Sequence, residues 1–261
     1  MGLLNRGMTI LDFDETYYAQ KKLQKFPHER IDFQQMQHVS LYCEQESLTT
    51  IEKKLSRRKQ KGVTFIGSGN YHYVTYLLLK EVKEPFTLIL FDNHPDLGTN
   101  PNQRESILSC GSWVSYALSE IPYLQKVVII GPTTLISFPS RNPRVVLFPY
   151  DRNHHYSIKS ILSVIHSQNV YISIDKDVLN PNEAVTNWDQ GLMDIVTLSH
   201  FLENILKNKR VEGVDICGEM HLSPLEIVLP DYQSSINKNE KANITLLKTS
   251  LKFSSTEIRG A

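Results

Sequence analysis

The chain has 261 residues, which is enough for one large α/β domain or two small ones with a sizeable core. Lysine and arginine together number 28, and aspartate and glutamate together also number 28, so the formal net charge is zero. A neutral chain has no electrostatic preference for nucleic acid or for an anionic membrane surface, and we expect neither as a partner.

The sequence contains no apolar run of about 18 residues, and its amino terminus lacks the basic segment followed by an apolar segment that is typical of signal peptides. We therefore predict neither a membrane span nor a signal peptide, and we expect a cytoplasmic protein. The three cysteines, Cys43, Cys110 and Cys217, are odd in number and widely spaced. This pattern fits reduced thiols better than a disulfide framework.

Short apolar runs bounded by turn residues predict strands, and helix-like stretches separate most of them. The predicted strands are residues 8–13, 38–43, 63–67, 86–91, 126–131, 144–149, 170–174 and 211–216. The predicted helices are residues 44–60, 71–83, 112–120, 157–167 and 194–208, then a loop over 232–243 and a last helix. This alternation predicts a mostly parallel sheet with helices on both faces, in one domain spanning residues 1–261.

The stretch TLILFDNHPDLG places polar residues directly after a buried strand. Asp92, His94 and Asp96 follow the predicted strand 86–91, at the kind of strand end where α/β proteins bind ligands. On an extended backbone, residues two apart point to the same side, so the three side chains can converge. Two carboxylates and an imidazole beside a buried strand favour a divalent metal, although structural networks use the same residue types.

Two further strand ends carry the same residue types. Strand 170–174 runs into DKDVLNP, which places Asp175 and Asp177 at the same alternate spacing. Strand 63–67 ends in the glycine-rich turn GSGNYHYVT, with His72 in the first turn of the following helix. Four carboxylates and two imidazoles at three strand ends predict two neighbouring cations, and this oxygen-rich set favours manganese over zinc.

These motifs resemble those of the ureohydrolase superfamily, which includes arginase, agmatinase and formimidoylglutamase. FDNHPD matches the family's D-A-H-x-D, SIDKDVLNP matches S-x-D-x-D-x-x-D-P, and DICGEMHLSP loosely matches the late D-x-x-E-x-x-P. The motif order and strand plan agree from about residue 60 to about residue 224. The resemblance implies an arginase-like three-layer α/β/α fold around an eight-stranded parallel sheet.

The resemblance also implies a binuclear manganese centre, two ions per chain, with zinc or another divalent ion as the alternative. The ligands it implies are His72, Asp92, Asp96 and Asp175 for one ion, and His94, Asp96, Asp175 and Asp177 for the other. Asp96 and Asp175 are expected to bridge the two ions. The family's glutamate that contacts the substrate guanidinium corresponds to Glu219.

The implied reaction is hydrolysis of a C–N bond in a small guanidino or amidino compound by a metal-bridging hydroxide. Glu219 is expected to bind the cationic nitrogens and Asp96 to steady the amino group of the intermediate. His221, two residues past Glu219, is expected to deliver the proton to the leaving group. The partner is thus a small molecule, and a homo-oligomer is left open.

The sequence departs from the family pattern at several points. GSGNYH replaces G-G-D-H, so His72 is a ligand in a shifted register. SCGSWVSYAL places Cys110 where the family has a proton-shuttling histidine. In NWDQG, Trp188 and Asp189 are expected to shape the substrate pocket, with a surface loop anchored by Trp188 as the alternative. The loop at residues 98–106 is expected to set specificity.

Three other functions are weighed against this one. LDFDET, with Asp12, Asp14 and Thr16, resembles the D-x-D-x-T of haloacid dehalogenase phosphatases, but the later acidic motif of those enzymes is missing. Deacetylase-like amidohydrolases share the fold and use one zinc ion. A non-catalytic descendant that keeps the fold and a metal is the third alternative.

Overall fold

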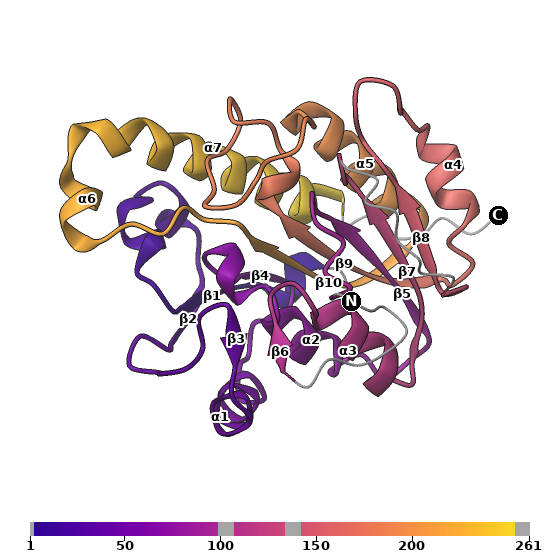
Figure 1. Cartoon of the computed structure of the whole chain (residues 1–261), viewed down its shortest axis with the longest axis horizontal. Coiled ribbons are helices and arrows are strands. Elements are labelled where there is room, and N and C mark those ends of the chain that lie inside the picture. The colour runs from indigo at the N-terminus through magenta and orange to yellow at the C-terminus, as the bar shows by residue number, and fades with distance from the viewer. Residues whose placement is uncertain (1–2, 99–106, 134–141, 254–261) are drawn as a thin grey trace.

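The computed structural model describes residues 3–98, 107–133 and 142–253, and within them the dominant feature is an eight-stranded sheet (Figure 1). Every strand pairs parallel to its neighbours, in the order β2-β1-β4-β10-β9-β5-β7-β8. Its strands are β1 (Met8–Asp12), β2 (Glu29–Asp32), β4 (Val63–Phe65), β5 (Phe86–Phe91), β7 (Leu124–Ile130), β8 (Val145–Phe148), β9 (Asn169–Asp175) and β10 (Arg210–Cys217). A separate antiparallel pair joins β3 (Tyr42–Cys43) to β6 (Leu108–Ser109).

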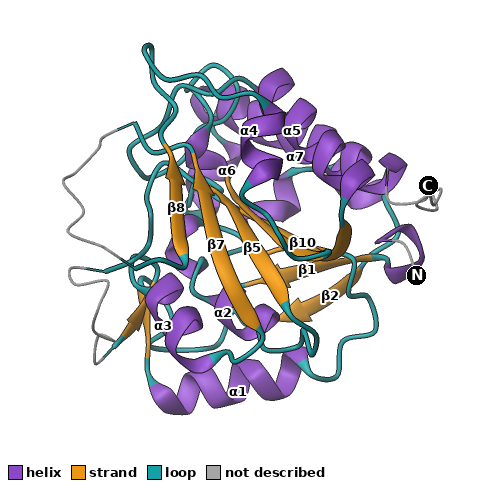
Figure 2. Ribbon diagram, turned by 90° about the vertical axis from the view of Figure 1, so that its right-hand side faces the viewer, coloured by secondary structure: helices purple, strands orange, loops and turns teal. Residues whose placement is uncertain are grey.

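Helices cover both faces of the sheet, as Figure 2 shows. One face carries α1 (Gln45–Leu55), α2 (Val74–Leu79) and α3 (Trp113–Glu120), and the other carries α4 (Ile158–Ser163), α5 (Ile195–Asn208) and α7 (Pro230–Phe253). The remaining helical segments are α6 (Pro224–Val228) and the 3-10 turns η1 (Leu3–Arg6), η2 (Thr16–Ala19), η3 (Leu23–Lys25), η4 (Gly69–Tyr71) and η5 (Lys176–Val178).

The unbroken apolar run of β5 follows from this layering. Leu88 and Leu90 pack into the core beneath α1, α2 and α3, whereas Ile89 and Phe91 pack into the core beneath α4, α5 and α7. A central parallel strand buries both faces and therefore has no polar alternation. The predicted three-layer α/β/α fold with eight parallel strands is confirmed.

The predicted strand at residues 38–43 is wrong. Of those residues only Tyr42 and Cys43 are in a strand, β3, and that strand lies outside the main sheet. The eighth strand of the main sheet is β2, whose sequence ERID contains one apolar residue. Because β2 is an edge strand with partly exposed side chains, it does not need the apolar run from which strands were predicted.

The predicted loop at residues 232–243 is also wrong, because α7 runs unbroken from Pro230 to Phe253. The first half of α7 buries a stripe of mostly polar residues at helical spacing, Ile236, Asn239, Glu240 and Asn243. The Glu240 carboxylate accepts hydrogen bonds from backbone N–H groups at the start of η3. A search for apolar periodicity misses a helix whose buried face is polar.

The strand order creates the site. From β1 the chain builds outward to β2, and from β5 it builds outward in the opposite direction to β7 and β8. The last two strands, β9 and β10, then fill the space between β4 and β5. The carboxyl ends of β4, β10, β9 and β5 are therefore neighbours, at the point where α/β sheets bind ligands.

Within the described residues, no helix is long and apolar enough to cross a membrane.

Candidate metal centre

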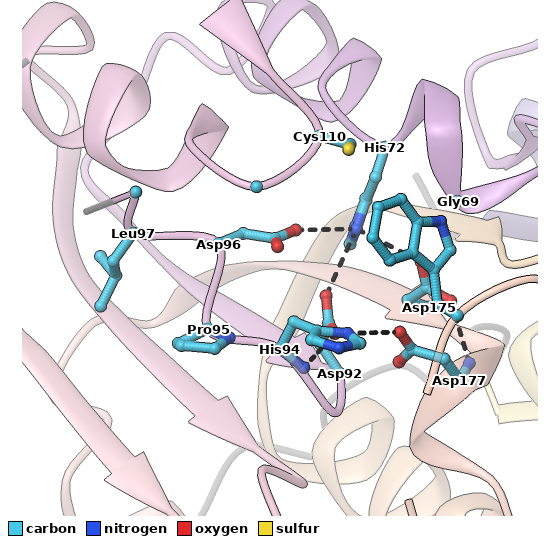
Figure 3. A pocket seen from close by; sticks show the side chains of 13 residues that line it. Gly69, His72, Asp92, His94, Pro95, Asp96, Leu97, Cys110, Asp175 and Asp177 are labelled. Atoms are coloured by element: carbon cyan, nitrogen blue, oxygen red, sulfur yellow. Dashed lines mark hydrogen bonds and ion pairs between the residues drawn. The ribbon is translucent and has the colours of Figure 1, made fainter. Parts of the chain in front are cut away.

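The six side chains predicted as metal ligands gather around one cavity of about 240 Å³ at these strand ends (Figure 3). They are His72, Asp92, His94, Asp96, Asp175 and Asp177. Five of them are buried, and only His94 is partly exposed, with 36% of its side chain accessible. The structure thus brings together residues that are up to 105 positions apart in the sequence, 72 to 177.

Tight turns at the ends of β5 and β9, not extended strand, bring alternate residues together. The Asp92 Oδ1 atom accepts a hydrogen bond from the His94 N–H at 2.6 Å. In the same way, the Asp175 Oδ1 atom accepts one from the Asp177 N–H at 2.9 Å. Aspartate readily caps the N–H two residues on in this way, so the D-x-H and D-x-D spacings each encode a turn.

The first cluster surrounds His72. Its Nδ1 atom lies 3.1 Å from Asp96 Oδ2, 3.3 Å from Asp92 Oδ2 and 3.6 Å from Asp175 Oδ2. Nitrogen and oxygen ligands with metal bonds of about 2.1 Å are separated by about 3.0 Å at right angles and about 3.4 Å at the tetrahedral angle. The observed separations are close to those of ligands on one ion.

The second cluster joins His94, Asp177 and Asp92. The His94 Nδ1 atom lies 2.7 Å from Asp177 Oδ2 and 3.7 Å from Asp92 Oδ1. Asp177 is also fixed through its other oxygen, which accepts a hydrogen bond from the Asn93 N–H at 2.9 Å. Asp92 therefore belongs to both clusters.

The donor set fits a divalent cation. The Asp92 Oδ2 atom is buried and accepts no hydrogen bond, which is costly for a carboxylate oxygen without a cation. Burial raises the pKa of Asp92, Asp96 and Asp175, and it raises the pKa of Asp177 to about 7. Without an ion, the cluster retains protons that a cation would displace.

A buried network sets the orientation of His72. The Ser173 hydroxyl donates to Asp215 Oδ1 at 2.7 Å, so it accepts from the His72 Nε2–H, which lies 2.9 Å away. The Thr75 hydroxyl donates to the same oxygen of Asp215 at 3.0 Å. This leaves His72 Nδ1 free to face the carboxylates, as is usual for histidines that bind metals. Sequence reasoning missed this network, although Ser173 and Asp215 each open one of the quoted motifs.

Asp96 is held by the start of α3. Its φ of 49° lies in the left-handed region, which aspartate tolerates better than most residues. The Trp113 indole N–H donates to Asp96 Oδ2 at 2.6 Å, and the Asp96 carbonyl accepts from the Val114 N–H at 3.1 Å. Trp113 was missed by sequence reasoning, which gave it no role.

The sequence matches the Arginase family over residues 9–219. The chain belongs to the arginase family. The resemblance seen in the three motifs is therefore confirmed. A relative from Thermotoga maritima, an uncharacterized protein, is 32% identical over 238 residues, which cover 91% of this chain and 87% of the relative.

Solved structures share the fold of this arginase-family chain. Agmatine ureohydrolase of Thermoplasma volcanium superposes with a TM-score of 0.66 at 15% identity, covering 97% of this chain and 92% of that one. Formimidoylglutamase from Bacillus subtilis superposes with a TM-score of 0.64 at 17% identity, covering 95% of this chain and 86% of that one. At these identities the likeness establishes the fold alone.

Glu219, predicted to contact substrate, lies outside the cavity lining. Its carboxylate forms a buried ion pair with Lys176, which is fully enclosed. Three amide side chains also donate to it, those of Gln20, Asn239 and Asn243. The alternation of β10 breaks at Gly218, where φ is 83° and a Cβ would come within 2.3 Å of Asp175 Oδ1. Glu219 therefore does not follow the direction that an extended backbone predicts.

His221 is not brought to the cavity either. It is exposed and is not among the cavity residues, and its backbone N–H donates to Asn187 Oδ1 at 2.5 Å. Asp189 is likewise exposed and outside the lining, and its carbonyl accepts from the side chain of Asn93 at 2.9 Å. The geometry gives neither side chain a place beside the clustered carboxylates.

Trp188 and Cys110 do line the cavity. The Trp188 indole N–H donates to Asn70 Oδ1 at 3.1 Å, and its ring centroid lies 6.0 Å from that of His94. Burial, followed by the nearby Asp96 charge, raises the pKa of the Cys110 thiol to about 12. At neutral pH Cys110 is therefore a neutral thiol in the cavity wall.

The loop predicted to set specificity spans residues 98–106, and of these residues 99–106 lie outside the described residues.

The acidic residues of the phosphatase-like motif form an ion pair and hydrogen bonds with neighbouring protein groups. Asp12 pairs with Arg30 at 2.8 Å. Asp14 accepts hydrogen bonds from the Thr16 hydroxyl at 2.7 Å and from the Ser68 N–H at 3.1 Å. Because these carboxylates bind protein groups and do not line the cavity, their arrangement offers no support for the phosphatase alternative.

We predict that Glu219→Gln lowers the free energy of unfolding by about 3–5 kcal/mol, because it leaves the buried Lys176 ammonium without its charge partner. Urea denaturation measures this change. The matched control is Glu203→Gln, which removes a solvent-screened surface pair with Lys207 and should leave the stability nearly unchanged. Equal stability of Glu219→Gln and the native chain would contradict the structural role of Glu219.

We also predict that divalent-metal affinity falls as the pH is lowered from about 7.5 to about 5.5. The pKa of Asp177 is raised to about 7, so below that pH its carboxyl holds a proton that the metal must displace. Each displaced proton weakens binding by up to about tenfold per pH unit. Metal titration calorimetry at both pH values measures the change, and equal affinity at the two would count against these ligands.

Proposed function

We propose that this arginase-family chain is a metal-dependent hydrolase that cleaves a C–N bond in a small guanidino or amidino compound. The observation that carries the proposal is the convergence of two His–Asp clusters, sharing Asp92, on one accessible cavity. The names of two structural neighbours, agmatine ureohydrolase and formimidoylglutamase, supply the substrate class.

The two clusters define which residues would hold each ion. His72, Asp96 and Asp175 would hold one ion, and His94 and Asp177 would hold the other. Asp92 reaches both clusters and is our choice for a bridging ligand, beside the Asp175 and Asp96 inferred from sequence. Two bound divalent ions, manganese in this proposal with zinc as the alternative, would supply Lewis acidity and lower the pKa of a shared water.

The other cavity residues favour a compact substrate. Gly69 has no side chain, and a Cβ there would come within 2.9 Å of Asp175 Oδ2 and 3.0 Å of Trp188 Cδ1. Trp188 supplies a flat apolar wall, while Pro95 and Leu97 add further apolar surface. A planar guanidino or amidino group is small enough to lie against this wall and approach the carboxylates.

We propose that the recognition of substrate nitrogen differs from the scheme implied by the family motif. The Glu219 carboxylate is committed to Lys176 and three amides, so it is not free to bind a guanidinium. Among the described cavity residues, the charged side chains are those of the six candidate ligands. We propose that Asp96, fixed by Trp113, orients the amino group of the substrate.

The test is a panel of arginine, agmatine, guanidinobutyrate, formimidoylglutamate and acetylated polyamines, offered to the manganese-loaded protein. We expect release of urea, ammonia or formamide from at least one of the first four compounds. Asp92→Asn and Asp175→Asn should each lower kcat by at least about a hundredfold, because each removes a ligand. Asp189→Asn, an exposed acid outside the cavity lining, is the matched control and should retain activity.

The panel also separates the alternatives. No turnover by a fully metal-loaded protein would contradict the proposed hydrolase and favour a non-catalytic metal-binding descendant. Turnover of the acetylated polyamines alone would favour a deacetylase-like amidohydrolase.

A further inference from the structure

A cysteine lies among the candidate ligands, although none of the family motifs assigns it a role. Cys217 is the last residue of β10 and pairs in register with Asp175, the last residue of β9. Its Sγ atom is 3.2 Å from Asp175 Oδ2, and its side chain is fully buried. The ligand atoms of Cys217, Asp175 and His72 all lie within 4.8 Å of one another.

The separations suit ligands on a single ion. With metal–sulfur bonds of about 2.3 Å and metal–oxygen bonds of about 2.1 Å, such ligands are about 3.1 Å apart at right angles and about 3.6 Å apart at the tetrahedral angle. The 3.2 Å between Cys217 Sγ and Asp175 Oδ2 falls in this range. The same Asp175 oxygen is 3.6 Å from His72 Nδ1, so one carboxylate oxygen lies close to both the sulfur and the imidazole nitrogen.

The surrounding contacts keep this arrangement fixed. The other oxygen of Asp175 is occupied by the Asp177 N–H, so Oδ2 is the oxygen that remains between Cys217 and His72. His72 is in turn held through Nε2 by Ser173, on the strand next to Cys217. The sulfur is therefore presented by a rigid sheet rather than by a loop, which is what a metal ligand requires.

We propose that Cys217 contributes its sulfur to the ion that His72 and Asp175 hold. This rests on the proposed metal centre and adds a ligand to it. The consequence is an unequal pair of positions, because the cluster of His94, Asp177 and Asp92 contains only nitrogen and oxygen donors. A soft sulfur ligand shifts the first position toward zinc, cobalt or iron, whereas oxygen-rich positions suit manganese.

The test is the absorption spectrum of the cobalt(II)-loaded protein. Coordination by a thiolate produces an intense sulfur-to-cobalt charge-transfer band in the near ultraviolet, which a hydrogen-bonded thiol does not. We expect the band in the native chain, its loss in Cys217→Ser and Cys217→Ala, and its retention in Cys110→Ser. Cys110 is the matched control, because it lines the cavity itself but belongs to none of the ligand clusters identified among the described residues, whereas Cys217 lies beneath the lining beside Asp175.

Metal competition gives a second readout that does not depend on activity. Replacing the sulfur should reduce the preference for zinc over manganese by about tenfold or more in Cys217→Ser. Native protein that binds cobalt in stoichiometric amounts without the band would overturn this inference and leave the metal centre standing. Native protein that binds no cobalt, zinc or manganese would overturn both, so the two failures are distinguishable.

Discussion

Mutual repulsion among four buried carboxylates is the constraint on which the site depends. Asp92, Asp96, Asp175 and Asp177 are almost fully enclosed, and like charges in such a place are unfavourable unless a cation neutralises them. The protein holds them together by backbone geometry, with turns capped by aspartate at the ends of two adjacent strands. The sheet thereby fixes the relative positions of the candidate donors.

The carboxyl end of β9 also connects the candidate site to helix α7. Between the two candidate ligands Asp175 and Asp177, Lys176 is enclosed and pairs with Glu219. Amides from α7 complete that pair, so the helix that covers one face of the sheet is joined to the turn that presents the ligands. A glutamate whose motif position suggests substrate binding is thus enclosed in a buried ion pair in this chain, where Gly218 redirects the backbone.

Strong local patterns in the sequence predicted the layers, the buried central strands and the six converging side chains. Those features follow from apolar runs that end in aspartate and histidine, and such runs can be recognised in the sequence alone. Sequence patterns did not predict the edge strand β2 or the first half of α7, because these segments are polar and their stability comes from tertiary partners. The positions of Glu219 and His221 were missed for a different reason: one left-handed glycine interrupts the alternation assumed for an extended chain. Cys217 was counted as a reduced thiol, and only the register of β10 against β9 shows its place beside Asp175.

We propose that the clustered carboxylates form a two-metal centre. The most direct test is elemental analysis of protein stripped with a chelator, reloaded with a mixture of manganese and zinc, and freed of unbound ions. The account predicts two ions per chain in the native protein and a marked loss of bound metal in Asp175→Asn, while that variant remains folded. Native protein that retains no ion after reloading, with an intact fold, would contradict it.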